Sequence, residues 1–174
     1  MELLNLLQHR RSVRSYTGEP VPEEALKEIL QAGLISASSR SLCPWEFIVV
    51  RDKETLAHLS RCRTAGAGML AKADCAIVVV ADEAKCDVWI EDCSIAMANM
   101  HLMADALGLG SCWVQGRLRT APDGRDTEEY IRSLLHYPES YRLEAMLSLG
   151  VAASHPAPRS LDSLEWSKVH RETF

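Results

Sequence analysis

The chain has 174 residues, of which 47% are hydrophobic and 25% charged, and its 19 basic and 24 acidic side chains give a net charge of −5. This composition lies close to the globular average and excludes a collagen-like rod, a coiled coil and a disordered chain. The mildly acidic balance argues against a general binder of nucleic acid or of anionic membranes, because both need a positive field.

The first 50 residues predict two helices, a loop and a strand. Leucines at near-helical spacing indicate a short helix over residues 1–9. Pro22 suits a first helical position, and the apolar spacing after it predicts a helix to about residue 33. A polar loop at 36–44 leads into the run 45–50, whose aromatic and β-branched residues are typical of a strand.

The middle of the chain predicts a buried strand and a long helix. Asp52 can cap a short helix that ends near residue 61. The run 75–81 is continuously apolar, which fits a central strand buried on both faces. The longest helical pattern covers 90–107, and Gly108 is a natural stop for it.

The last third predicts two strands around a helix. A glycine-led turn at Gly110 opens the first strand, and 143–152 forms the second. Asp126 and Glu129 resemble a capping box for a helix to about residue 135. Helices and strands are interspersed, so the class is mixed α and β. A doubly wound Rossmann fold is disfavoured, because no Gly-x-Gly-x-x-Gly follows the first strand.

Length, cysteines and the N-terminus bear on domains and location. We expect one domain over residues 1–174, large enough to need no disulfide or metal staple. The six cysteines form no Cys-x-x-Cys pair, and no cysteine or histidine spacing predicts a metal site. Buried free thiols in a reducing cytosol are the favoured interpretation. Without a signal peptide pattern or an ~18-residue apolar run, the expected location is cytoplasmic, away from membranes.

A basic cluster follows the first predicted helix and comprises Arg10, Arg11, Ser12 and Arg14. Arginine offers forked planar donors that match phosphate oxygens, and a neighbouring hydroxyl adds a further hydrogen bond. One interpretation is therefore an anchor for a single small phosphate. The other is that these arginines are solvated and offset the negative end of the first helix dipole.

Two further segments could serve a polar ligand. Ser38, Ser39 and Ser41 supply hydroxyl and amide groups in a loop, although an ordinary surface connection explains them as well. The turn at Gly110 and Ser111 would let a ligand approach backbone N–H groups, or would only end the preceding helix. The sequence has no Gly-x-Ser-x-Gly elbow or Walker loop, so any catalysis is expected to rely on a bound cofactor.

Taken in order, these motifs resemble the nitroreductase family of flavin-dependent oxidoreductases. The resemblance runs through Arg10–Tyr16, Ser38–Phe47, the segment Ala106–Trp113 and the closing residues Trp166–Phe174. It implies an α+β three-layer sandwich, in which helices flank a mostly antiparallel sheet. It also implies an intertwined homodimer with two FMN molecules at its interface and a tail, 154–174, that packs on the partner subunit.

The resemblance also implies roles for individual residues. In one subunit, the phosphate and ribityl chain would be held by Arg10, Arg11, Ser12 and Arg14. From the other subunit, the flavin would be reached by Ser38, Ser39 and Ser41. Backbone donors at Gly110 and Ser111 would lie near the ring, and a late basic residue, Arg159, would meet the phosphate. Hydride would pass from NADH or NADPH to flavin N5 and on to an acceptor such as a nitroaromatic or quinone.

The sequence departs from the family pattern at several positions. Ser41 replaces the usual Asn, Cys43 replaces the usual Gln, and residues 66–69 lack the Asn and Lys that many relatives place there. Two alternatives to the reductase therefore stay open. One is a flavin store or sensor without turnover, and the other is a specialised flavin enzyme for dehalogenation, heterocycle oxidation or flavin breakdown.

Overall fold

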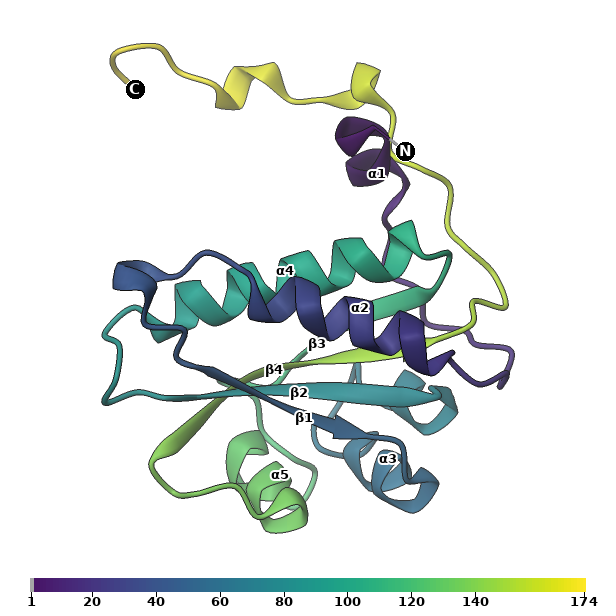
Figure 1. Cartoon of the computed structure of the whole chain (residues 1–174), viewed down its shortest axis with the longest axis vertical. Coiled ribbons are helices and arrows are strands. Elements are labelled where there is room, and N and C mark those ends of the chain that lie inside the picture. Colours follow the sequence, from purple (N-terminus) through teal and green to yellow (C-terminus); the bar gives the residue numbers. More distant parts are fainter. Residues whose placement is uncertain (1) are drawn as a thin grey trace.

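The computed structural model describes residues 2–174, and its centre is one four-stranded sheet (Figure 1). The strand order is β1-β2-β4-β3, and every neighbouring pair is antiparallel. This confirms the predicted antiparallel sheet and excludes the doubly wound parallel fold. The strands are β1 (Trp45–Val50), β2 (Cys75–Asp82), β3 (Gly110–Gln115) and β4 (Tyr141–Gly150).

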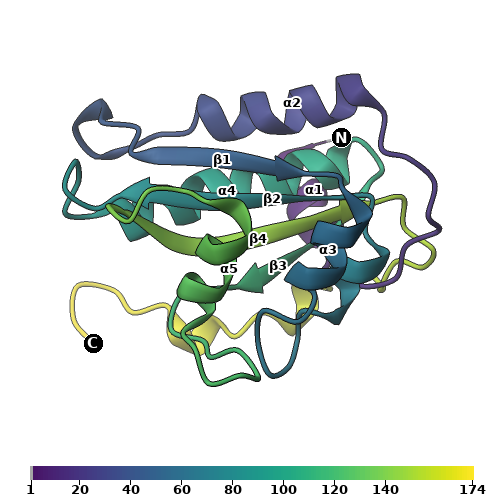
Figure 2. The same cartoon turned by 90° about the horizontal axis from the view of Figure 1, so that it is seen from below.

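Helices cover both faces of the sheet, with α2 and α4 on one side and α3 and α5 on the other (Figures 1 and 2). The predicted three-layer α+β sandwich is therefore confirmed. The α-helices are α1 (Leu3–His9), α2 (Glu23–Leu34), α3 (Lys53–Leu59), α4 (Trp89–Ala106) and α5 (Thr127–Leu135). Single 3₁₀ turns lie at η1 (Ser39–Ser41), η2 (Gly68–Lys72), η3 (Leu161–Ser163) and η4 (Trp166–Lys168).

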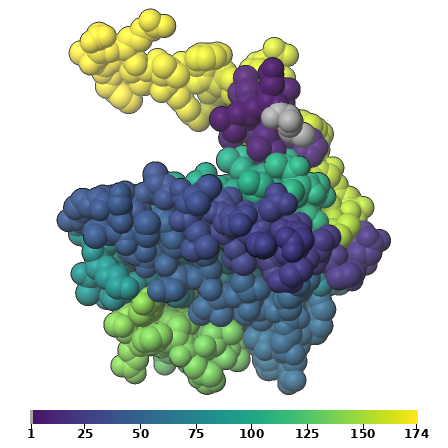
Figure 3. All heavy atoms as spheres, in the orientation of Figure 1, coloured from purple at the N-terminus to yellow at the C-terminus, as the bar shows by residue number. Residues whose placement is uncertain are grey.

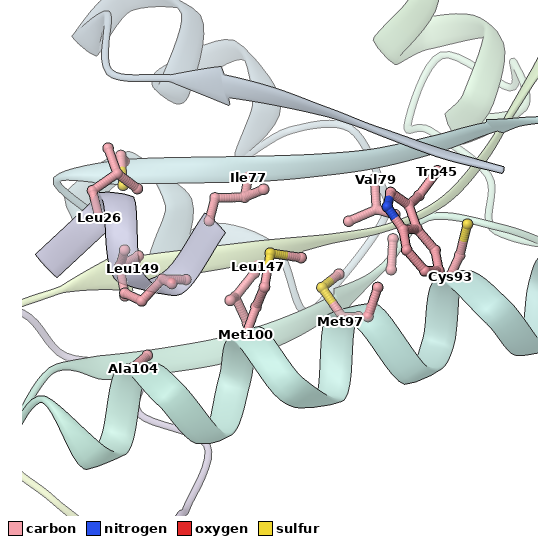
Figure 4. Close-up of a cluster of buried hydrophobic side chains, with 14 of the residues drawn as sticks. Leu26, Trp45, Ile77, Val79, Cys93, Met97, Met100, Ala104, Leu147 and Leu149 are labelled. Carbon is pink, nitrogen blue, oxygen red and sulfur yellow. The ribbon is translucent and has the colours of Figure 1, made fainter. Parts of the chain in front are cut away.

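The apolar run of β2 is buried on both faces, as predicted. Because side chains alternate along a strand, Ile77 and Val79 join the core under α2 and α4, whereas Val78 and Val80 join the core over α3 and α5. Figure 4 shows the first core, where Met97 and Met100 of α4 lie against the sheet. The sheet is thus fixed between two apolar layers, and α4 is its main support on one face.

Several element ends follow the predicted chemistry. Asp52 caps α3 by accepting from the Thr55 amide at 2.7 Å, and Asp126 caps α5 by accepting from the Glu128 amide at 2.8 Å. The predicted capping box is not completed, because within residues 2–174 the Glu129 side chain makes no bond back to Asp126. Gly108 ends α4 with a φ of +74°, a left-handed conformation that favours glycine. The turn predicted at Gly110 is wrong, because Gly110 already belongs to β3.

The tail from residue 154 onward extends along α1 and away from the three layers (Figure 3). It exposes apolar side chains, with 71% of Trp166 and 60% of Val169 accessible. All six cysteines are free; five are buried, and Cys43 is exposed. Among residues 2–174, no helix has both the length and the apolar character needed to cross a bilayer.

Candidate functional site

The basic segment after α1 lies along the free edge of β3. The amide of buried Val13 donates to the Ser111 carbonyl at 2.9 Å, and Ser12 forms a parallel bridge with Ser111. A Cβ on Gly110 would come within 2.6 Å of the Val13 side chain, so a glycine is needed where the two segments meet. Gly110 and Ser111 therefore hold the basic segment in place.

Arg10 is oriented by a chain of hydrogen bonds. It donates to Nε2 of His101 at 2.9 Å, and Nδ1 of His101 lies 2.5 Å from the Ser111 hydroxyl. Burial of His101, and then the neighbouring charge of Arg10, lower the histidine pKa to about 4. A neutral ring accepts at Nε2 and donates from Nδ1, so His101 links the guanidinium to β3.

The start of the tail brings another cation to this place. The Arg159 amide donates to the Gln8 carbonyl at 2.9 Å, Gln8 returns a bond to the Arg159 carbonyl at 3.0 Å, and Arg11 donates to the Ala157 carbonyl. Burial, and then the charge of Arg159, lower the pKa of Arg10, while Asp105 acts in the opposite direction. We call Arg10, Arg11, Arg14 and Arg159 the arginine cluster.

The serine loop, residues 38–43, is a second polar site. The Ser38 hydroxyl accepts from the Cys43 amide at 3.0 Å, and the Ser39 amide donates to buried Asp92 of α4 at 2.8 Å. Arg40, Ser41 and Cys43 all have positive φ values, between 44° and 54°. Such conformations cost about 1–3 kcal/mol each and concentrate at binding and catalytic sites.

The arginine cluster and the serine loop lie at opposite ends of α4 (Figure 1). Asp92 contacts the serine loop near the start of the helix, and His101 contacts Arg10 near its end. Asp92 and Asp105 are 13 residues apart, which is about 20 Å along the axis. One protomer thus gathers Arg10, Arg11, Ser12, Arg14, Gly110, Ser111 and Arg159 at one end, and places Ser38, Ser39 and Ser41 at the other.

Sequence reasoning missed several polar residues at the arginine end. His101 and Asp105 share one face of α4 at i, i+4 spacing. Asp105 is buried and lies 2.7 Å from Nδ1 of His9 and 3.2 Å from Nε2 of His155. The i, i+4 spacing of two buried polar residues was the available signal, but their partners lie far away in the chain.

Comparison with known proteins shows that this chain is similar to members of one family in both sequence and structure. The sequence pattern of the Nitroreductase family matches residues 7–62 and 57–151. An FMN-dependent nitroreductase of Clostridium difficile R20291 is 44% identical with a TM-score of 0.96, covering 99% of this chain and 100% of that one. A protein of Archaeoglobus fulgidus, provisionally named NADH dehydrogenase/NAD(P)H nitroreductase, is 37% identical over 99% of both chains.

A further similar structure was solved with a cofactor bound. It is a provisionally named nitroreductase of Desulfovibrio desulfuricans in complex with FMN, 27% identical with a TM-score of 0.77. The alignment covers 100% of this chain and 98% of that one. The likeness therefore extends over the arginine cluster, the serine loop and the start of the tail.

Proposed function

This chain belongs to the nitroreductase family, and we propose that it is an oxidoreductase that binds FMN, takes electrons from NADH or NADPH and passes them to a nitroaromatic or quinone. The observation that carries the proposal is the arginine cluster, which concentrates positive charge in a chain of net charge −5. FMN, when bound, supplies the two-electron chemistry.

The residues of the arginine end fit a phosphate group. Arg10 is held by His101, so its guanidinium is oriented before a ligand arrives. Burial, and then the neighbouring charges of Arg159 and Arg11, lower the pKa of Arg10, and a phosphate would offset the repulsion between these charges. Bidentate arginine–phosphate pairs are strong and directional. We assign phosphate binding to Arg10, Arg11, Ser12, Arg14 and Arg159.

The serine loop would complete the site from a second copy of the chain. The loop and the arginine cluster contact positions of α4 that are about 20 Å apart along its axis, which is long for one small cofactor within one protomer, whereas a two-fold axis beside α4 would bring them together. Apolar side chains are exposed nearby, including Ile35 at 83% and Leu3 at 66%. A groove of about 340 Å³ between α1, α2 and α4 contains both. We propose a homodimer in which Ser38, Ser39 and Ser41 reach the partner's flavin and the tail packs on the partner.

The edge of β3 would receive the ring system. The Ser111 carbonyl points outward to Val13, and because alternate residues of an edge strand face the same way, the backbone groups of Trp113 also face outward, whereas the Gln115 carbonyl already accepts from Arg63 at 3.0 Å. The backbone groups of Trp113 can bind the polar rim of the flavin and orient it. Gly110 and Ser111 would act indirectly, by fixing Val13 and His101. The protein's part in the reaction is thus binding and orientation, with no side-chain nucleophile.

The experiment that tests the function is anaerobic reduction of the purified protein. We expect a yellow preparation that NADH or NADPH bleaches and that a quinone then recolours. A bound flavin that neither nucleotide reduces would contradict the reductase and favour the store or sensor. A colourless protein that takes up no FMN would overturn the assignment of the cofactor site.

The arginine cluster can be tested separately with Arg10→Ala combined with Arg14→Ala. Each hydrogen bond from a charged donor contributes about 1.5–3 kcal/mol, so losing two should weaken FMN binding about 100-fold or more. Fluorescence titration of apoprotein with FMN measures the dissociation constant. Arg61→Ala with Arg119→Ala is the matched control, because it removes two exposed arginines elsewhere and should leave the constant unchanged. Equal FMN affinity in the two double variants would contradict the assignment.

A further inference from the structure

Three potential metal ligands from distant parts of the chain meet beside the arginine cluster. They are His9 at the end of α1, Asp105 at the end of α4 and His155 at the start of the tail, with one ligand atom of each within 4.8 Å of the others. We call them the His–Asp–His cluster. The imidazole rings of His9 and His155 stack, with centroids 4.4 Å apart. Separations of 96 and 50 residues from Asp105 hide the cluster from motif analysis.

Hydrogen bonding fixes how His155 faces Asp105. Its Nδ1 lies 2.8 Å from the Pro156 carbonyl, which can only accept, so Nδ1 carries a proton. In the neutral ring, Nε2 then presents a lone pair to Oδ1 of Asp105 at 3.2 Å. Two acceptors facing each other repel, so a cation belongs between them, either a proton on Nε2 or a metal ion in its place. The bond from Nδ1 to a backbone carbonyl is also the usual outer support of a metal-bound histidine.

The geometry points to a divalent transition-metal site formed by His9, Asp105 and His155. Zn²⁺ binds imidazole nitrogen and carboxylate oxygen at about 2.0–2.2 Å, which places two ligands of a tetrahedral ion about 3.3 Å apart. The His155–Asp105 separation of 3.2 Å already fits this value. The His9 side chain is 43% exposed, so its ring has room to turn toward the ion. Two histidines and one carboxylate suit zinc or a similar borderline metal and leave one position for water.

The surroundings both oppose and favour a cation here. Arg10 and Arg159 lie close enough for their charges to interact and would repel a metal. The carboxylate of Asp105 is buried in the last turn of α4, where the negative end of the helix dipole attracts a cation. A phosphate bound by the arginines would offset the repulsion further. Because the ligands come from α1, α4 and the tail, the ion would fasten the tail to the body beside the proposed FMN site.

Zn²⁺ binding to the full-length protein tests this site. Isothermal titration after chelator treatment would be run in a Cys43→Ser background, since Cys43 is the exposed thiol of the chain. We expect about one Zn²⁺ per chain. His155→Ala and His9→Ala should each weaken binding at least about 10-fold, because even changes around metal ligands typically cost 10- to 100-fold. His170→Ala and His136→Ala, at exposed positions outside the cluster, are the matched controls.

The readout is independent of flavin content and of activity, so it does not depend on the proposed function. Loss of binding in both cluster variants, with full binding in both controls, would establish the site. No uptake of Zn²⁺ by the parent protein would overturn it. Unchanged affinity in His155→Ala, or an equal loss in the control variants, would also overturn it.

Discussion

Each end of α4 carries a buried aspartate, but the two aspartates contact very different segments of the chain. At the start of the helix, buried Asp92 accepts from the Ser39 amide and holds a strained loop whose one charged side chain, Arg40, is paired with Asp87. At its end, buried Asp105 faces two histidines and lies within the field of Arg10. One end thus presents hydroxyl and amide groups, and the other presents positive charge.

This difference is the reason for proposing that the two ends complement each other in one cofactor site. The arginine end can hold a phosphate but offers few neutral groups, whereas the serine loop offers neutral groups but no charge cluster. A molecule such as FMN has both an anionic end and a neutral polar ring. Because the two ends are about 20 Å apart along α4, the proposed function has two copies of the chain supply the two kinds of group.

The largest expected effect comes from mixing two defective chains. One carries Arg10→Ala with Arg14→Ala, and the other carries Ser41→Trp, which places a bulky ring in the serine loop. Neither homodimer should retain FMN. A mixed dimer has one site with both defects and one with none, so we expect about half of the wild-type flavin content. Purification through two different affinity tags, followed by absorbance, measures this ratio.

Two outcomes of this mixing experiment would contradict the proposal that the two ends of α4 meet across a dimer interface. If the mixed dimer holds as little FMN as either parent, the two ends do not meet across an interface. If a monomer retains FMN in light-scattering and absorbance measurements, one end suffices. Wild-type chains carrying the same two tags provide the control for full occupancy.

A smaller effect is expected from removing the carboxylate at the start of α4. Asp92→Ala leaves the Ser39 amide and the Cys86 thiol without their acceptor, and Asp92 is only 3% exposed. Losing a buried acceptor of this kind should lower the free energy of unfolding by about 2–3 kcal/mol. FMN binding should weaken as well, although Asp92 lies far from the arginine cluster. Urea unfolding and flavin titration measure the two effects.

Asp92→Asn is the matched control, because the amide keeps an oxygen acceptor for Ser39 and nearly the same shape. We expect it to retain most of the stability and most of the FMN affinity. If Asp92→Ala loses stability but keeps full FMN affinity, the serine loop is a structural connection only. That result would leave the arginine cluster as a self-sufficient site.

Local patterns in the sequence predicted the elements well, because they depend on neighbours in the chain. The apolar run of β2, the cap at Asp52 and the stop at Gly108 all follow from local chemistry. The basic cluster at Arg10–Arg14 was visible for the same reason. The boundaries of the predicted elements were less exact, as at Gly110, which belongs to β3 because it pairs with Gly150 of β4.

The parts that could not be predicted depend on tertiary contacts. The pairing of Arg10 with His101 spans 91 residues, and the bond between Gln8 and Arg159 spans 151. No local pattern encodes such pairs. The placement of the serine loop at the far end of α4 likewise depends on how α2 packs on α4, which a helical pattern alone does not specify.

The smallest expected effect concerns His101 and the pH dependence of stability. Its pKa is about 4 in the folded protein and about 6.5 when unfolded. As the pH falls, the unfolded chain therefore takes up the proton before the folded protein does. The contribution of neutral His101 to the free energy of unfolding is thus fully present above pH 6.5 and is lost as the pH falls toward 4. Between pH 7 and pH 5 the free energy of unfolding should fall by about 2 kcal/mol from this cause. His101→Gln should remove that part of the pH dependence, whereas His170→Gln, in the exposed tail, should keep it. Equal slopes of unfolding free energy against pH in the wild type and His101→Gln would show that His101 is not held neutral between Arg10 and Ser111.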